Sequence, residues 1–242
     1  MYIGAVELPP SPMVGYSVAM TVTLYIETSG AHCSLALAHG EQIFALDRQL
    51  ERAHNQHLLP MLDELFEQAN LRPAQTDLLA FGCGPGSFTG VRIAAAATQA
   101  IALVAEAPVV AVPSTLAMAI TAADRHGQHT LLCSVKSRGQ AYYLAVYETA
   151  SSAVDVRQIQ PDQLWDATPS WLVGLEDRAI GIGVRPDWLA PDMISVWDDD
   201  VSPRAAALIP WVIEQHHRGL SRPAEWALPR YVEGDSPWKK SV

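Results

Sequence analysis

Lysine is almost absent from this chain of 242 residues, which holds it at positions 136, 239 and 240 and nowhere else. Charged residues make up 17% of the sequence and the formal net charge is −10, whereas an average soluble protein has about 25% charged residues. A protein that grips a nucleic-acid backbone by itself needs clustered cations. We therefore expect any link to RNA to run through another protein, and the scarcity of charge favours a surface that a partner covers.

Cysteine is also scarce, because only Cys33, Cys83 and Cys133 occur, far apart and odd in number. This pattern excludes a disulfide framework and is typical of reduced thiols in the cytoplasm. We expect all three side chains to be small buried hydrophobic groups.

Long hydrophobic runs are missing, since no stretch of 18 or more consecutive apolar residues occurs. We therefore expect no transmembrane helix. The first 20 residues lack a basic start and contain three prolines, so they do not resemble a signal peptide. We predict a loose N-terminal extension over residues 1–20, with Met20 as an alternative start, in a cytoplasmic protein without membrane contact.

Three short runs at residues 23–28, 33–38 and 42–47 are separated by turn residues, which predicts an antiparallel meander. The apolar spacing then changes and predicts a helix over 58–69, with Pro60 in its first turn. Leu59 and Phe66, seven residues apart, form a second apolar stripe that we expect to lie off the core face.

A short buried strand at 77–81 leads through a glycine-rich loop, residues 82–90, into a helix over 91–106. Across 91–105 the polar residues are Arg92, Thr98 and Gln99. A helix that is apolar or small nearly all round must be covered on more than one side. The sequence therefore predicts that something besides its own sheet packs against this helix.

The second half is less regular. We predict paired strands at 131–136 and 141–147, further strands at 171–174 and 179–183, and a helix over 203–217 that Pro210 kinks or breaks. All seven tryptophans lie between Trp165 and Trp238. This shift in composition predicts an α/β protein of two lobes, 21–115 and 116–242, with the helix at 203–217 a candidate to pack back on the first lobe.

The loop Gly-Cys-Gly-Pro-Gly-Ser-Phe-Thr-Gly at 82–90 has two readings. It could present backbone N–H groups to an anion, or it could be a tight connection in which Ser87 or Thr89 caps the following helix. A dinucleotide fingerprint needs glycine where Ser87 stands, a phosphate loop needs a lysine, and a serine elbow needs glycines where Pro85 and Thr89 stand. These failures favour the tight connection.

Other polar groups also have a functional and a plain interpretation. Glu27, Thr28 and Ser29 end the first strand and could hold Mg²⁺ and a phosphate, or they could form an ordinary polar turn. His54 and His57 have no HExxH pattern and no third ligand at a convincing spacing, so surface or capping roles are favoured and no metal site is predicted. The acidic run at 198–200 is typical of a solvated loop.

Three strings occur in an order that resembles one protein family. They are Ile26-Glu27-Thr28-Ser29, the segment from His54 to Leu58-Leu59-Pro60, and the segment from Gly82 to Ile93 that contains Pro-Gly-Ser-Phe-Thr-Gly-Val-Arg. This chain resembles the TsaB (YeaZ) family of tRNA threonylcarbamoyladenosine biosynthesis. The likeness is clear over residues 22–118 and weaker afterwards, at 135–138, Tyr143 and 229–231.

The resemblance implies the fold of actin, the sugar kinases and ribonuclease H, with two lobes that each hold a mixed sheet flanked by helices. It implies a non-catalytic partner of the catalytic subunit TsaD, which with TsaE and ATP transfers a threonylcarbamoyl group to the adenosine 3′ of the anticodon in tRNA. ATP or ADP and a metal ion are then expected on the partner's side, with no cofactor of this chain's own and with tRNA bound only indirectly.

The resemblance also implies a surface on the two helices of the first lobe, which can bind TsaD or a second copy of the chain. The residues placed at this contact are Leu59, Phe66, Arg92, Ala96, Gln99 and Leu103. Two departures matter: Glu27 stands where the family usually has aspartate, and Lys136-Ser137-Arg138 replaces an Asp-Ala-Arg string. The alternative is a kinase-like ATPase or an M22-type glycoprotease that acts alone.

Overall fold

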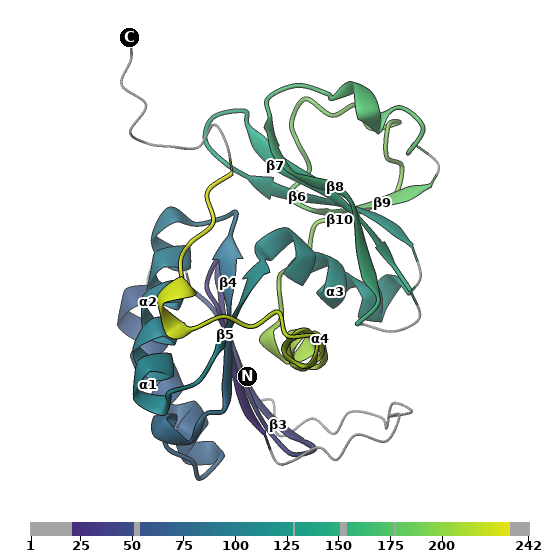
Figure 1. The fold of residues 1–242 in the computed structure, drawn as a ribbon. Helices are drawn as coiled ribbons and strands as arrows, with labels where there is room; N and C mark the ends of the chain where they lie inside the picture. Colours follow the sequence, from purple (N-terminus) through teal and green to yellow (C-terminus); the bar gives the residue numbers. More distant parts are fainter. Residues whose placement is uncertain (1–20, 51–53, 128, 151–153, 177, 233–242) are drawn as a thin grey trace.

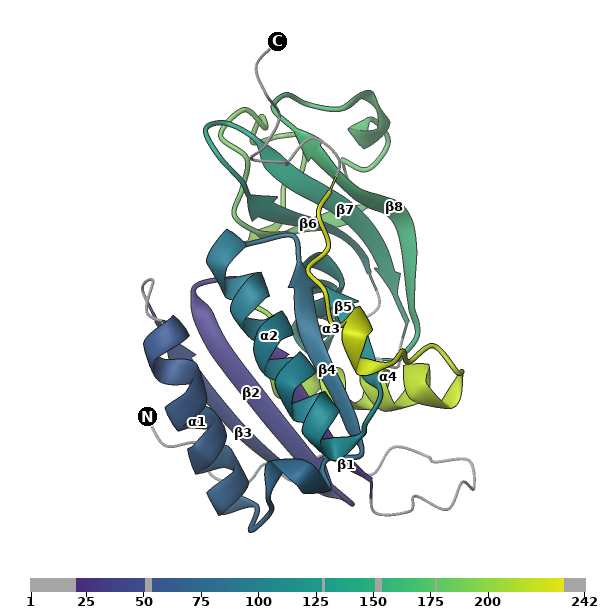
Figure 2. The ribbon, with the colours of Figure 1, turned by 60° about the vertical axis from the view of Figure 1, so that its left-hand side comes forward.

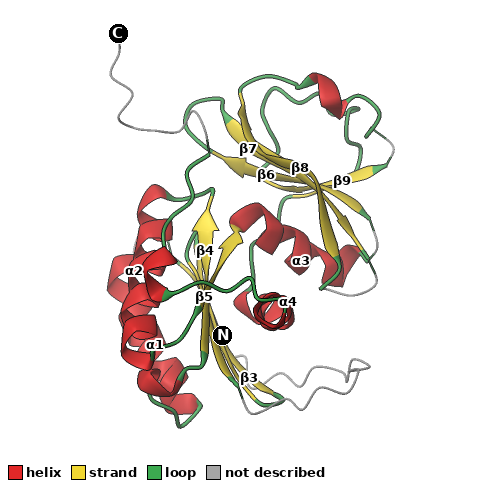
Figure 3. Cartoon of the chain, viewed as in Figure 1, coloured by secondary structure: helices red, strands yellow, loops and turns green. Residues whose placement is uncertain are grey.

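The structure, a computed structural model, describes residues 21–50, 54–127, 129–150, 154–176 and 178–232. It holds two five-stranded sheets, with helices on them and between them (Figures 1 and 3). Each sheet combines parallel and antiparallel pairs, so the predicted α/β fold with two mixed sheets is confirmed. The predicted N-terminal extension lies outside the described residues.

The first sheet has the strand order β3-β2-β1-β4-β5. Its strands are β1 (Val22–Glu27), β2 (His32–His39), β3 (Gln42–Gln49), β4 (Leu78–Gly84) and β5 (Val109–Pro113). The first three form the predicted antiparallel meander, whereas β4 and β5 continue the sheet in parallel because helices cross over between them. Along β1, Leu24 and Ile26 enter one core and Tyr25 enters the other, as the period of two requires.

Two helices cover one face of this sheet, α1 (His54–Gln68) and α2 (Phe88–Ala105). On the opposite face lies α4 (Ala205–His217), which follows the second sheet in sequence but packs against β1 and β2. The helix α3 (Ser114–His126) lies between the two sheets and contacts strands of both (Figure 1). The two sheets and α3 therefore share one continuous core.

The second sheet has the order β10-β9-β6-β7-β8. Its strands are β6 (Thr130–Lys136), β7 (Tyr142–Thr149), β8 (Val156–Trp165), β9 (Ala179–Gly183) and β10 (Trp197–Asp198). Tryptophans 165, 171, 188 and 197 pack on a third core on this sheet, which accounts for their crowding in the second half. Three short 3-10 helices complete the described chain: Pro73–Gln75, Ser170–Leu172 and Ala224–Trp226.

Several strands of the second half differ from expectation. The strand predicted at 171–174 is wrong, because the chain forms the 3-10 helix Ser170–Leu172 there. The ten-residue strand β8 was not predicted at all. Buried and exposed residues do not alternate regularly along β8, and the strand contains Pro161. The sheet tolerates this proline because β8 is an edge strand with register shifts against β7.

The prolines at positions 60 and 210 lie inside uninterrupted helices. α1 begins four residues before the predicted start, so Pro60 lies in the middle of the helix and not in its first turn. α4 runs without interruption from Ala205 to His217 through Pro210, so no break occurs. A proline removes one helical hydrogen bond, and the buried neighbours Ile209 and Val212 hold α4 against the first sheet despite that loss.

Candidate functional site

The glycine-rich loop between β4 and α2 is a tight connection, as predicted. Oγ of Ser87 accepts a hydrogen bond from the backbone N–H of Gly90 at 3.1 Å and so caps α2. A Cβ atom added at Gly86 would lie 2.3 Å from the carbonyl oxygen of Ser29, and one added at Gly90 would lie 1.9 Å from that of Thr28. The open side of the loop therefore faces the chain's own β1–β2 turn.

The hydroxyl-bearing turn after β1 is fastened to this loop by hydrogen bonds. Oγ1 of Thr28 donates to the carbonyl oxygen of Gly90 at 2.8 Å, and the N–H of Ser87 donates to the carbonyl oxygen of Ser29 at 2.7 Å. Both turn residues are buried. In this arrangement Thr28 and Ser29 connect two segments of the first lobe.

Glu27 is enclosed by the same turn. Its carboxylate accepts from the N–H of Ser29 at 2.8 Å and from the hydroxyl of Tyr25 at 3.2 Å, and only 1% of the residue is exposed. A Cβ atom at Gly82 would lie 2.2 Å from its Oε2. Burial raises the pKa of Glu27, and hydrogen bonds from Ser29 and Tyr25 offset only part of this effect.

The predicted nucleotide-binding trio of Glu27, Thr28 and Ser29 is thus brought together, but in a closed form. Both oxygens of the Glu27 carboxylate already accept hydrogen bonds from within the chain, and burial disfavours the charge that a Mg²⁺ ligand needs. A phosphate or cation at this place would require the β1–β2 turn to move away from the loop. Nucleotide binding by these residues stays a prediction.

One of the two histidines near the start of α1 is buried. His54 is buried, and its Nε2 lies 3.0 Å from the carbonyl oxygen of Gly30, so the surface interpretation is wrong for this residue. It connects the first turn of α1 to the β1–β2 turn. Within the described ranges, no three His, Cys, Asp or Glu side chains gather in a way that could hold a metal ion.

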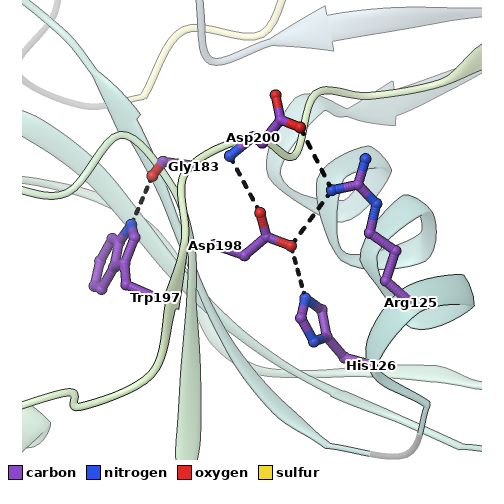
Figure 4. A network of polar contacts seen from close by, with 6 residues as sticks. All are labelled: Arg125, His126, Gly183, Trp197, Asp198 and Asp200. Atoms are coloured by element: carbon purple, nitrogen blue, oxygen red, sulfur yellow. Dashed lines mark hydrogen bonds and ion pairs between the residues drawn. The ribbon is translucent and has the colours of Figure 1, made fainter.

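The acidic run at 198–200 is less solvated than predicted at its first position. Oδ2 of Asp198 lies 2.9 Å from Nε2 of His126 and 3.5 Å from Nη1 of Arg125, at the end of α3 (Figure 4). Its Oδ1 accepts from the N–H of Asp200 at 3.1 Å. These contacts fix the short edge strand β10 to α3, which is a structural role.

The exposed side of α1 and α2 carries large apolar side chains. Leu59 on α1 is 64% exposed, and Leu103 and Val104 on α2 are 63% and 67% exposed. Ala96, nearer the start of α2, is also exposed. Phe66 does not belong to this surface, because it is 4% exposed and packs in the core under α1. Its prediction as an off-core residue is wrong, since α1 turns both the Leu58 and Phe66 stripes toward the sheet.

The described part of the chain contains one helix, α2, with the length and apolar composition of a membrane span, and a third of it is buried in the molecule. Length and composition alone are weak evidence that α2 crosses a membrane. In this structure α2 packs on β4 and on the 3-10 helix Pro73–Gln75.

Comparisons with known proteins agree on one family. The Escherichia coli protein "tRNA threonylcarbamoyladenosine biosynthesis protein TsaB" is 28% identical over 229 residues, which cover 90% of this chain and 96% of that protein. The Haemophilus influenzae protein of the same name is 35% identical over 122 residues, covering 50% of this chain and 52% of its own length. The solved structure "YeaZ from Pseudomonas aeruginosa" superposes with a TM-score of 0.75 at 27% identity, over 88% of this chain and all of that chain.

The chain is similar to the TsaB family over most of its length. A family model described as "TsaD: tRNA N6-adenosine threonylcarbamoyltransferase" also matches residues 47–165. TsaB relatives and that transferase family therefore share sequence features over about half of this chain. The match includes α1, the glycine-rich loop and α2, but it leaves out the strand that carries Glu27.

Two of the residues that the TsaB resemblance placed at a contact have partners inside this chain. Nε2 of Gln99 donates to the carbonyl oxygen of Ala224 at 3.3 Å. The guanidinium of Arg92 lies 3.3 Å from the ring centroid of Phe88 and 5.0 Å from that of Tyr231. The C-terminal segment therefore covers the side of α2 that these two residues form.

Other exposed apolar side chains, at the start of α2 and in the C-terminal segment, could not be found from sequence patterns. Phe88, at the start of α2, is 50% exposed, and Trp226, Leu228 and Tyr231 in the C-terminal segment are 62%, 58% and 50% exposed. Helical spacing drew attention to Arg92 and its neighbours, whereas the C-terminal segment carries no periodic signal. Only the folding of this segment back along α2 brings it beside that helix (Figure 2).

Proposed function

We propose that this chain is a non-catalytic subunit that binds and activates a TsaD-like catalytic subunit, which transfers a threonylcarbamoyl group to the adenosine 3′ of the anticodon in tRNA. The relatives named as tRNA threonylcarbamoyladenosine biosynthesis proteins support the pathway. The fold neighbour named YeaZ and the match to the TsaD family support the protein class.

One contrast carries the proposal. The polar groups that could bind a metal ion or nucleotide, centred on Glu27, are buried and hydrogen-bonded within the chain. The apolar groups of α1 and α2, among them Leu59 and Leu103, are open to solvent. Exposed leucine and valine side chains on two adjacent helices are the kind of surface that a second protein buries.

The accompanying molecules follow from this role. ATP or ADP and a metal ion belong on the side of the catalytic subunit, and a TsaE-like ATPase completes the assembly. The net charge of −10 supports an indirect contact with tRNA. Buried, unpaired thiols at positions 33, 83 and 133 suit the cytoplasm, where tRNA is modified.

The same surface also fits a second copy of the chain. In that case a homodimer would exclude the catalytic subunit, because both would cover α2. We propose that the heterodimer is the working form and that the homodimer competes with it.

The first test is co-purification of this chain with the TsaD-like protein from the same source, with Leu103→Glu as the disrupting variant. A charge at the centre of an apolar contact should raise the Kd by at least about 30-fold, which corresponds to about 2 kcal/mol. Val173→Glu is the matched control, because Val173 is 72% exposed but lies in the second lobe.

A complex lost with Leu103→Glu and kept with Val173→Glu supports both the function and the surface. Absence of any complex at micromolar concentrations, with the TsaE-like protein and ATP present, would contradict the proposal. Turnover of ATP or peptide by the isolated chain, abolished by Glu27→Ala, would instead favour the ATPase or glycoprotease alternative.

A further inference from the structure

The chain after α4 returns to the first lobe and then continues to the second. Residues 222–232, here called the C-terminal strap, run beside α2 and past the end of β4 toward the second sheet (Figure 2). The strap begins with a pair of backbone hydrogen bonds between Arg222 and Val109, at 2.7 and 2.8 Å. It thereby covers the outer edge of β5, the last strand of the first sheet.

The far end of the strap is anchored where β4 becomes irregular. The pairing of β4 with β5 shifts between Gly82 and Gly84, which leaves Cys83 as an extra residue. The carbonyl oxygen of Cys83 accepts the N–H of Arg230 at 2.8 Å. A Cβ atom at Gly84, whose φ is +101°, would lie 3.2 Å from the carbonyl oxygen of Arg230, so glycine leaves room for the strap.

The side chain of Arg230 reaches from this anchor to the other lobe. Its Nη1 lies 3.5 Å from Oδ2 of Asp162, whose side chain is fully buried on β8. Oδ1 of Asp162 accepts from the hydroxyl of Thr115 on α3 at 2.6 Å, and Oδ2 has no hydrogen-bond donor among the described residues. Burial raises the pKa of Asp162, while Thr115 and Arg230 oppose this shift. A buried carboxylate that loses its cation is left uncompensated.

The two sheets and the glycine-rich loop therefore meet at one arginine. The backbone of Arg230 is bound to the first sheet, its guanidinium is paired with the second sheet, and Tyr143 of β7 lines a small pocket with Arg230 and the glycine-rich loop. The preceding strap residues Trp226 and Leu228 are exposed beside α2.

We propose that the C-terminal strap is an interlobe clasp, in which the pair of Arg230 and Asp162 limits movement of the second sheet against the first, in addition to the core that α3 shares with both sheets. Movement between two lobes is the usual mode of change in a two-domain fold, and this ion pair lies across the boundary. The clasp also connects the exposed side of α2 with the second lobe, because the same segment borders both.

Hydrogen–deuterium exchange of the full chain tests the clasp. Arg230→Met should speed exchange in the peptide that covers residues 222–232 by at least about tenfold, because the far anchor opens more often. The matched control is Arg218→Met, which removes an exposed arginine from an i,i+4 pair with Glu214 and leaves the strap contacts intact. Arg230→Lys keeps the charge and should give a smaller increase than Arg230→Met.

A double-mutant comparison isolates the pair. In an Asp162→Asn background, Arg230→Met should change the exchange rate less than twofold, because its partner charge is already gone. Spin labels on Glu41→Cys and Val173→Cys, one in each lobe, give a distribution of distances between the lobes. This distribution should become broader in Arg230→Met and stay narrow in Arg218→Met. Equal effects of both arginine variants, or an unchanged strap and label distance in Arg230→Met, would overturn the proposal.

Discussion

Two helices of this protein, α2 and α3, reverse the usual relation between composition and burial. α2 is the more apolar helix, yet only six of its 18 residues are buried. α3 carries threonine, aspartate and arginine, yet nine of its 13 residues are buried. α3 lies between the two sheets, whereas α2 has a sheet on one side only. The position of a helix between two sheets or on one sheet therefore decides how many of its residues are buried. An apolar helix with one side exposed to solvent indicates a surface for a partner.

Ile120 tests the closed side of this comparison. It is 0% exposed in the middle of α3, so Ile120→Ala should lower the free energy of unfolding by about 2–5 kcal/mol, because a cavity between two sheets cannot collapse. Urea denaturation measures the loss. Leu103→Ala on α2 should change stability by less than about 0.5 kcal/mol, and equal losses in the two variants would remove the distinction.

The polar contacts of α3 should matter nearly as much as its apolar ones. The hydroxyl of Thr115 bonds Asp162 at 2.6 Å and lies 3.0 Å from the hydroxyl of Tyr147. Thr115→Val keeps the shape but removes the donor, which should cost about 1–3 kcal/mol. Thr115→Ser is the control that keeps the hydroxyl, and it should recover most of the melting temperature lost in the valine variant.

Leu59 tests whether the open side extends from α2 to α1. If both helices form one surface, Leu59→Glu should weaken binding to the TsaD-like subunit by about 1–2 kcal/mol, as titration calorimetry would measure. Its 64% exposure predicts an unchanged fold. Full affinity in this variant would confine the contact to α2.

Glu27 tests the closed turn beneath the start of α2, and the expected effect on stability is the smallest. Because burial raises the pKa of Glu27 in the folded protein, its contribution is fully present below the unfolded pKa of about 4 and is lost as pH rises through the folded pKa. Glu27→Gln keeps the hydrogen-bonding shape without the charge.

The stability of Glu27→Gln relative to the parent should therefore improve as pH rises above about 4 and level off above the folded pKa of Glu27, measured by denaturant unfolding at each pH. A difference that does not change with pH would mean that the folded pKa of Glu27 is ordinary. The same variant separates the two interpretations of the turn, since a Mg²⁺-nucleotide site would also lose its ligand.

Local patterns predicted the regular parts of the fold well. The three strands of the meander, the glycine-rich connection capped by Ser87, and the helix after it follow from alternation, turn residues and capping. Predictions failed where neighbours distant in sequence decide. Phe66 is buried because it packs in the core between α1 and the first sheet, and β8 forms because it pairs with β7.

The candidate site divides in the same way. The exposure of Leu59 and Leu103 could be predicted from helical spacing, because a helix has only one face toward its sheet. The closure of Glu27 could not, since it depends on Gly82, which is distant in sequence and lies against the carboxylate.

By itself, the sequence determined the α/β class, the family resemblance and the apolar character of α2, because propensity, periodicity and short motifs act within a few residues. Only the tertiary structure decided which polar groups are closed, which side of α2 stays open, and that residues 222–232 join the lobes. Those outcomes depend on contacts between residues more than 50 positions apart, such as Cys83 and Arg230 or Asp162 and Arg230, and no local pattern encodes such contacts.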